Sequence, residues 1–228
     1  EIINIDHNIE HALYRLWKTG EIYLEKPRVE DELRNILHYL VNVFPDVIPI
    51  IDRRMLQAGK FAGFNIDEMC EKYAFPKITF GDWVGGDRDG HPLVTAEITE
   101  KTLMLLRLNA FVVIRRKLMS LVQNISFNLE VEDSIPEFHE RITEMTAELG
   151  ERGEEAFNRN RGEAFRQMVN LMLYKLPVET ARGHATKLNE QEGSYLHSLQ
   201  LRDDLKLLQK ALIDYGAKSI ALDDVVSV

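Results

Sequence analysis

The chain has 228 residues, of which 45% are hydrophobic and 29% are charged, and its formal net charge is -9. This length is enough for one large domain or two small ones, and an acidic surface argues against nonspecific binding to nucleic acid or anionic membranes. A single cysteine, Cys70, allows no internal disulfide and no cysteine-based zinc cluster, which is typical of a reducing compartment. No stretch approaches the roughly 20 apolar residues that span a bilayer. We therefore expect a cytoplasmic protein with no nucleic-acid or membrane partner.

The N-terminal part of the chain is predicted to form three helices. Asp6 can cap the first, which carries apolar residues along one face. Pro27 and the acidic residues after it are typical of the start of a second helix, which Pro45 would end. A shorter third helix is predicted over residues 47–57.

A short strand is predicted over residues 77–80, where the sequence includes β-branched side chains. Such a strand needs pairing partners that the rest of the chain hardly supplies. The chain also begins at Glu1 rather than at a methionine. Both observations predict that the sequence is part of a longer protein.

The remainder of the chain is predicted to be helical. Thr95 can cap a long helix whose apolar residues cover more than half of its circumference, so we expect that helix to be buried. Ser134 and Glu137 have the spacing of a capping box, and the helix that follows should end near Gly150. Residues 151–162 are predicted as an exposed connection.

Two more helices are predicted near the C-terminus, one with an apolar stripe over residues 164–172 and one that stops at Gly216. Residues 177–193 between them are predicted as a loop, because proline and glycine punctuate them. The whole chain, residues 1–228, is therefore expected to be a single and mainly helical unit.

A glycine-rich segment at residues 80–92 is the candidate functional site. It holds one cation, Arg88, between Asp87 and Asp89. Glycine residues allow positive φ angles and let a ligand approach the main chain, and an arginine offers a planar donor fork for carboxylate or phosphate. The glycines are Gly81, Gly85, Gly86 and Gly90. The segment therefore predicts an anion-binding loop, although Arg88 could also brace the loop through ion pairs to its two neighbours.

Other sites are less well supported by spacing. A calcium loop counted from Asp87 would need a glutamate at its twelfth position, where Ile98 stands. His7 and His11 lie four residues apart on a predicted helix, but the sequence places no third metal ligand beside them. His91 could titrate near a bound anion or could be a plain turn residue. Trp17 and Trp83 are by default packing residues.

Three segments resemble phosphoenolpyruvate carboxylases, in the order in which that family has them. Residues 85–90 match the family's Gly-Gly-Asp-Arg-Asp-Gly motif. Residues 16–22, followed by Lys26-Pro27 and Asp31-Glu32, resemble its upstream tryptophan-threonine-acidic-isoleucine segment. Residues 163–166 resemble a downstream stretch that opens a helix with an aromatic-arginine pair.

The resemblance implies a carboxylase that adds bicarbonate to phosphoenolpyruvate and yields oxaloacetate and phosphate for central carbon metabolism. It implies that Arg88 binds and orients these anionic substrates and acts in catalysis. Trp17 would line the apolar pocket beside the enol methylene, while Asp87 and Asp89 would hold the arginine and the loop. It further implies a divalent metal (Mg or Mn) and a homo-oligomeric parent enzyme built on a helix-wrapped α/β (TIM-type) barrel.

Parts of the family's pattern are missing from this chain. It has no His-Pro-Thr-Glu stretch, no second glycine-arginine loop and no recognisable metal carboxylates. We therefore expect a fragment from the middle of the enzyme, inactive on its own.

The chain also departs from the family's pattern at single positions, namely Gly20, Tyr23, Asp82, Val84 and His91. A non-catalytic helical relative and a module that binds an anionic metabolite are the alternatives.

Overall fold

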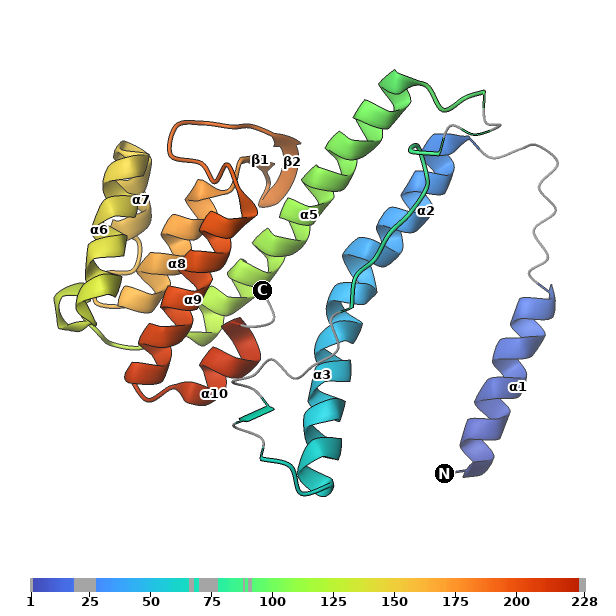
Figure 1. The fold of residues 1–228 in the computed structure, drawn as a ribbon, viewed down its shortest axis with the longest axis horizontal. Helices are drawn as coiled ribbons and strands as arrows, with labels where there is room; N and C mark the ends of the chain where they lie inside the picture. The colour runs from blue at the N-terminus through green and yellow to red at the C-terminus, as the bar shows by residue number, and fades with distance from the viewer. Residues whose placement is uncertain are drawn as a thin grey trace.

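The computed structural model describes residues 2–18, 28–65, 68–69, 78–87, 89 and 92–225. Arg88, Gly90, His91 and Cys70 lie outside the described residues. The described part is mostly helical, as expected from the sequence (Figure 1). Its helices are α1 (Ile2–Lys18), α2 (Val29–Asn42), α3 (Phe44–Phe61), α5 (Ala96–Asn124), η1 (Val131–Asp133), α6 (Pro136–Leu149), α7 (Glu151–Asn158), α8 (Ala164–Lys175), α9 (Ser198–Asp214), α10 (Lys218–Ile220) and the π-helical η2 (Ala221–Val225). No helix among these residues is both long and apolar enough to cross a membrane.

The main core lies in residues 118–225, which we call the C-terminal bundle. Helix α8 is its centre, because α5, α6, α7 and α9 all pack against it. Phe165 on α8 is fully buried and makes edge-on or tilted aromatic contacts with Phe127, Phe138 and Tyr215. The three partners lie in the segment after α5, in α6 and directly after α9, so the core joins these parts of the bundle.

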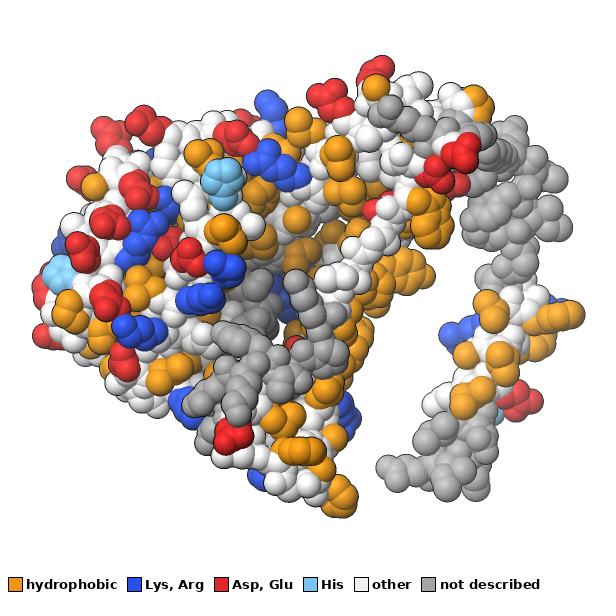
Figure 2. All heavy atoms as spheres, viewed as in Figure 1, with side chains coloured by type: hydrophobic (Ala, Val, Ile, Leu, Met, Phe, Trp, Pro, Cys, Tyr) orange, Lys and Arg blue, Asp and Glu red, His pale blue; other side chains and the backbone are white. Residues whose placement is uncertain are grey.

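Residues 2–117, which we call the N-terminal region, bury far less. Their buried apolar cluster consists of Val29, Leu33 and Val84. Helix α1 stands apart from the other helices in Figure 1, and the apolar side chains described on it, from Ile9 to Trp17, are exposed. Figure 2 shows hydrophobic side chains along α3 and on α1, whereas charged side chains of both signs cover the visible face of the bundle.

Several helix boundaries agree with the sequence. The hydroxyl of Thr95 caps α5 by accepting from the Ile98 N–H at 3.3 Å. Gly150 ends α6 with a φ of 59°, and Gly216, just beyond α9, has a φ of 94°. The boundary between α2 and α3 falls at Val43 and Phe44, with Pro45 in the first turn of α3.

Other predicted boundaries are wrong. Helix α1 already begins at Ile2, so Asp6 lies within it and does not cap it. Helix α3 runs from Phe44 to Phe61 and is longer than the predicted 47–57. Pro136 starts α6, and the Ser134 hydroxyl donates to the Val131 carbonyl of η1, so the predicted capping box does not form.

The predicted strand at 77–80 is also wrong where it is described, because residues 78–80 form no regular structure. Phe80 instead stacks on Phe44 of α3, with ring centroids 4.1 Å apart. The two strands in the described residues, β1 (Val178–Ala181) and β2 (His184–Leu188), pair with each other in an antiparallel hairpin.

Both predicted loops of the C-terminal half contain regular structure. Residues 151–158 form α7 instead of an exposed connection. The hairpin of β1 and β2 occupies much of 177–193, and its turn has positive φ at both Arg182 (50°) and Gly183 (83°). Two successive residues with positive φ are typical of a tight two-residue hairpin turn.

A buried charge network ties α6 to α9 within the bundle. Asp204, which is buried, accepts from Arg141 Nε at 2.6 Å and from the Tyr195 hydroxyl at 2.7 Å. Burial disfavours the charge of Arg141, but the hydrogen bonds and charge of Asp204, together with hydrogen bonds to Glu144 and Glu148, outweigh it and raise the arginine pKa. Burial and the Asp204 carboxylate together raise the pKa of Tyr195 well above its usual value. Asp204 therefore compensates an arginine that would otherwise be costly to bury.

Candidate functional site

The glycine-rich loop folds back on itself through backbone hydrogen bonds. The Trp83 carbonyl accepts from the N–H groups of Gly86 and Asp87 at 3.1 and 3.0 Å. The Asp82 carboxylate accepts from the Val84 N–H at 2.8 Å. Val84 is buried with Val29 and Leu33 of α2. The first half of the loop is thus a defined turn that is anchored on α2.

Gly85 fastens this turn to the N-terminal end of α5. Its φ is 72°, and a Cβ at this position would lie 2.3 Å from Oγ1 of the buried Thr102. Its carbonyl accepts a hydrogen bond from the Thr99 hydroxyl at 2.7 Å. Both the backbone angle and the close approach require glycine at this position.

The backbone on either side of position 88 is held by one further contact. The Asp87 carboxylate accepts from the Asp89 N–H at 3.0 Å, which forms a side-chain turn around Arg88. Asp87 and Asp89 are exposed. The predicted roles of Arg88 and Gly90 concern residues outside the described part of the chain, so the ion-pair alternative for Arg88 stays open.

The two tryptophans lie in different places, and neither is a packing residue. Trp17 lies near the end of α1 and is 83% exposed. Trp83 lies within the loop, five positions before Arg88, and is 73% exposed. Sequence reasoning singled out Trp17 and overlooked Trp83, although its position inside the motif was a signal. The structure therefore adds Trp83 to the candidate site.

The side chains of the described residues give no support for a metal site. Within the ranges that the structure describes, no group of three or more His, Cys, Asp or Glu residues is placed to hold a metal ion. His7 and His11 lie with ring centroids 4.4 Å apart on α1, as their spacing predicts.

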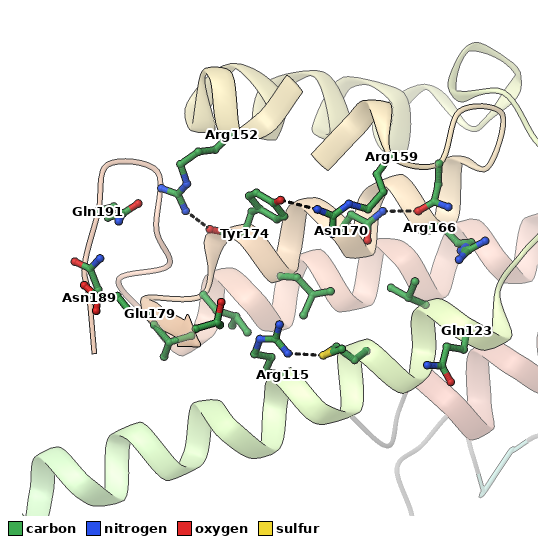
Figure 3. A pocket seen from close by; sticks show the side chains of 17 residues that line it. Arg115, Gln123, Arg152, Arg159, Arg166, Asn170, Tyr174, Glu179, Asn189 and Gln191 are labelled. Atoms are coloured by element: carbon green, nitrogen blue, oxygen red, sulfur yellow. Dashed lines mark hydrogen bonds between the residues drawn. The ribbon is translucent and has the colours of Figure 1, made fainter. Parts of the chain in front are cut away.

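A second feature is a cavity of about 700 Å³ that α5, α7, α8 and β1 border (Figure 3). Four arginines line it, so we call it the arginine cavity: Arg115, Arg152, Arg159 and Arg166. Sequence reasoning missed it because three separate helices contribute these side chains. The regular spacing of arginines at 152, 159 and 166 was the only hint in the sequence.

Comparison with known proteins gives a consistent result. The model of the family described as phosphoenolpyruvate carboxylase matches residues 1–228. A phosphoenolpyruvate carboxylase from Methylorubrum extorquens is 34% identical over 211 residues, which are 92% of this chain and 22% of that protein. Phosphoenolpyruvate carboxylase 1 from Chlamydomonas reinhardtii is 30% identical over an alignment of 243 positions, gaps included, which covers 93% of this chain and 23% of that protein. The chain thus spans about a fifth of the length of the curated relatives it matches.

Proposed function

This chain belongs to the phosphoenolpyruvate carboxylase family, and we propose that it supplies the arginine-bearing loop of a carboxylase active site. The reaction joins phosphoenolpyruvate and bicarbonate to give oxaloacetate and phosphate. Support comes from the family match along the whole chain and from the fixed backbone around position 88. Because the relatives are about five times longer, the complete reaction is proposed for a whole enzyme that contains this segment.

The observation that carries the proposal is the hydrogen-bonded turn at Gly85, Gly86 and Asp87. Hydrogen bonds between described residues hold the main chain on both sides of position 88. Preorganised donors stabilise developing negative charge best when they need not move during the reaction. We propose that this turn presents the Arg88 guanidinium to an acidic substrate in that way.

Arg88 would act on charge that moves between oxygens. Bicarbonate attacks the phosphorus atom, the bond from phosphorus to the enol oxygen breaks, and the resulting enolate captures the carbon dioxide released from carboxyphosphate. Apart from carbon dioxide, every species in this sequence is anionic, so a guanidinium can bind and orient each of the anions. We propose Trp17 as the apolar wall beside the enol methylene. Trp83, which lies in the same loop as Arg88, is a second candidate for that role.

The finer features implied by the family remain proposals. These are a helix-wrapped α/β barrel, a divalent metal (Mg or Mn), a homo-oligomeric assembly and a cytoplasmic location. The described residues do not supply a set of ligands that fits a metal, so no step is assigned through one. The chain alone is expected to show no turnover of phosphoenolpyruvate and bicarbonate, and detectable oxaloacetate formation would contradict this.

The substrate-binding part of the proposal is tested by calorimetric titration of the chain with phosphoenolpyruvate. Replacing Arg88 with glutamine should weaken binding at least tenfold, because it removes a charged hydrogen-bond donor. Arg202→Gln is the matched control, since Arg202 is an exposed arginine on α9 outside both the loop and the arginine cavity. Circular dichroism checks that the variants stay folded. Equal affinities for wild type and Arg88→Gln would refute the assignment.

A binding module without turnover is the second candidate, and Asp82 favours it. Its carboxylate is part of the turn and adds negative charge where an anionic substrate would approach. Assay of the whole enzyme separates the two candidates. A module would bind phosphoenolpyruvate through Arg88 but form no oxaloacetate.

A further inference from the structure

The arginine cavity carries an imbalance of charge. Arg159 pairs with Glu155 at 3.2 Å, and Arg166 pairs with Glu163 at 2.8 Å. The charges of these two guanidinium groups are therefore compensated by glutamates that are not part of the cavity lining. Glu179 on β1 is the only carboxylate that the described lining contributes.

Two lining arginines have no carboxylate partner among the residues that the structure describes. Arg152 on α7 donates to the Tyr174 carbonyl at 2.6 Å, and Arg115 on α5 donates to the sulfur of Met119. Both side chains are half-buried. In Figure 3, they enter the space from opposite sides, with α7 on one side and α5 on the other.

Leaving such groups unpaired is unfavourable. Burial lowers the pKa of Arg115, because the half-buried guanidinium has lost part of its hydration. A carbonyl and a thioether satisfy a guanidinium much less well than a carboxylate or phosphate does. In addition, Nε of Arg166 is buried without a hydrogen-bond partner. Arg115 and Arg152 would therefore gain from an anion in the cavity.

We propose that the arginine cavity binds a small polyanion with at least two carboxylate or phosphate groups, held between Arg115 and Arg152. Its volume of about 700 Å³ is in the range of small-molecule sites. Amide side chains at Gln123, Asn189 and Gln191 line the same space and can bond further ligand oxygens. This site is additional to the loop and does not depend on the function proposed for it.

Pyrophosphate and succinate are suitable probes, since the first carries two phosphate groups and the second carries two carboxylate groups. Calorimetric titration at constant ionic strength should give saturable binding of at least one of them to the chain. Arg115→Gln and Arg152→Gln should each weaken that binding about tenfold or more, because each removes a charge-assisted hydrogen bond. The preferred probe tells whether the site favours phosphate or carboxylate groups.

Glu179→Gln should strengthen probe binding, whereas the arginine variants should weaken it. It removes the one carboxylate of the described lining from an exposed strand position, so binding should tighten about threefold without a risk to the fold. Arg202→Gln and Arg88→Gln should bind the preferred probe with the affinity of the wild type. The Arg88→Gln result distinguishes binding in the arginine cavity from binding at the glycine-rich loop. The proposal is overturned if neither probe saturates, if Arg115→Gln binds unchanged, or if Arg88→Gln abolishes binding.

Discussion

The C-terminal bundle and the N-terminal region of this chain differ in how completely they bury their apolar side chains. Phe165 in the bundle is fully buried, whereas Phe61 at the end of α3 is 96% exposed and Leu103 on α5 is 61% exposed. The bundle therefore has a packed core, while the N-terminal region offers apolar faces that no described residue covers. The glycine-rich loop belongs to this less buried region, so its geometry depends on local hydrogen bonds more than on a surrounding core.

The sharpest way to test this difference is to truncate one phenylalanine in each region. Phe165→Ala should lower the free energy of unfolding by about 4 kcal/mol, because it leaves a cavity in a packed core. Phe61→Ala should change it by no more than about 0.5 kcal/mol, since the ring is already in water. Urea unfolding followed by circular dichroism measures both. Similar losses for the two variants would show that the N-terminal region has a core of its own.

The charge network of the bundle should give the next largest effect. Asp204→Asn leaves Arg141 without its buried counter-charge, which should cost about 3 kcal/mol of unfolding free energy. Asp203→Asn is the matched control, because its neighbouring carboxylate is exposed and pairs with Arg202 at 3.3 Å on the surface. That change should cost less than about 1 kcal/mol. Equal costs in urea unfolding would mean that the buried pair does not stabilise the bundle.

Gly85→Ala should have a smaller effect, centred on the loop. An alanine there would adopt an unfavourable φ and would also meet Thr102, for a total of about 2 kcal/mol. Gly63→Ala is the control: its φ is 83°, but no atom lies within 4 Å of the added Cβ, so about 1 kcal/mol is expected. Hydrogen exchange at the Gly86 and Asp87 amides reports the local effect. Unchanged exchange in Gly85→Ala would contradict the tight approach to α5.

Helix positions in both regions could largely be predicted, because they depend on local patterns. Thr95 capping α5 and the glycines at 150 and 216 ending their helices are short-range features, and all three predictions are confirmed. The degree of burial could not be predicted in the same way. The apolar circumference of α5 indicated a buried helix, yet Leu103 and Met104 are exposed. Burial depends on neighbours, and periodicity says nothing about which neighbours are present.

Two of the errors in the bundle arose because a glycine can belong to regular structure as well as to a loop. Gly153 was interpreted as part of a loop, but it lies inside α7, where a Cβ would come within 2.2 Å of the Thr146 carbonyl of α6. Gly183, likewise taken as a loop residue, forms the turn of a hairpin.

For the candidate site, the sequence motif identified the loop, and the structure added Trp83 and the contacts to Thr99 and Thr102. The arginine cavity could not be predicted from the sequence, because it forms only when α5, α7 and α8 pack together.

Helix α5 links the two regions and has a consequence for ligand binding. Thr102 supports the loop near one end of this 29-residue helix, and Arg115 faces the arginine cavity farther along. At about 1.5 Å per residue, the two positions are roughly 20 Å apart along the helix axis. Ligands at the two proposed sites would therefore not touch each other, because the helix between the sites does not shorten. Any competition between these ligands would have to be transmitted through the protein.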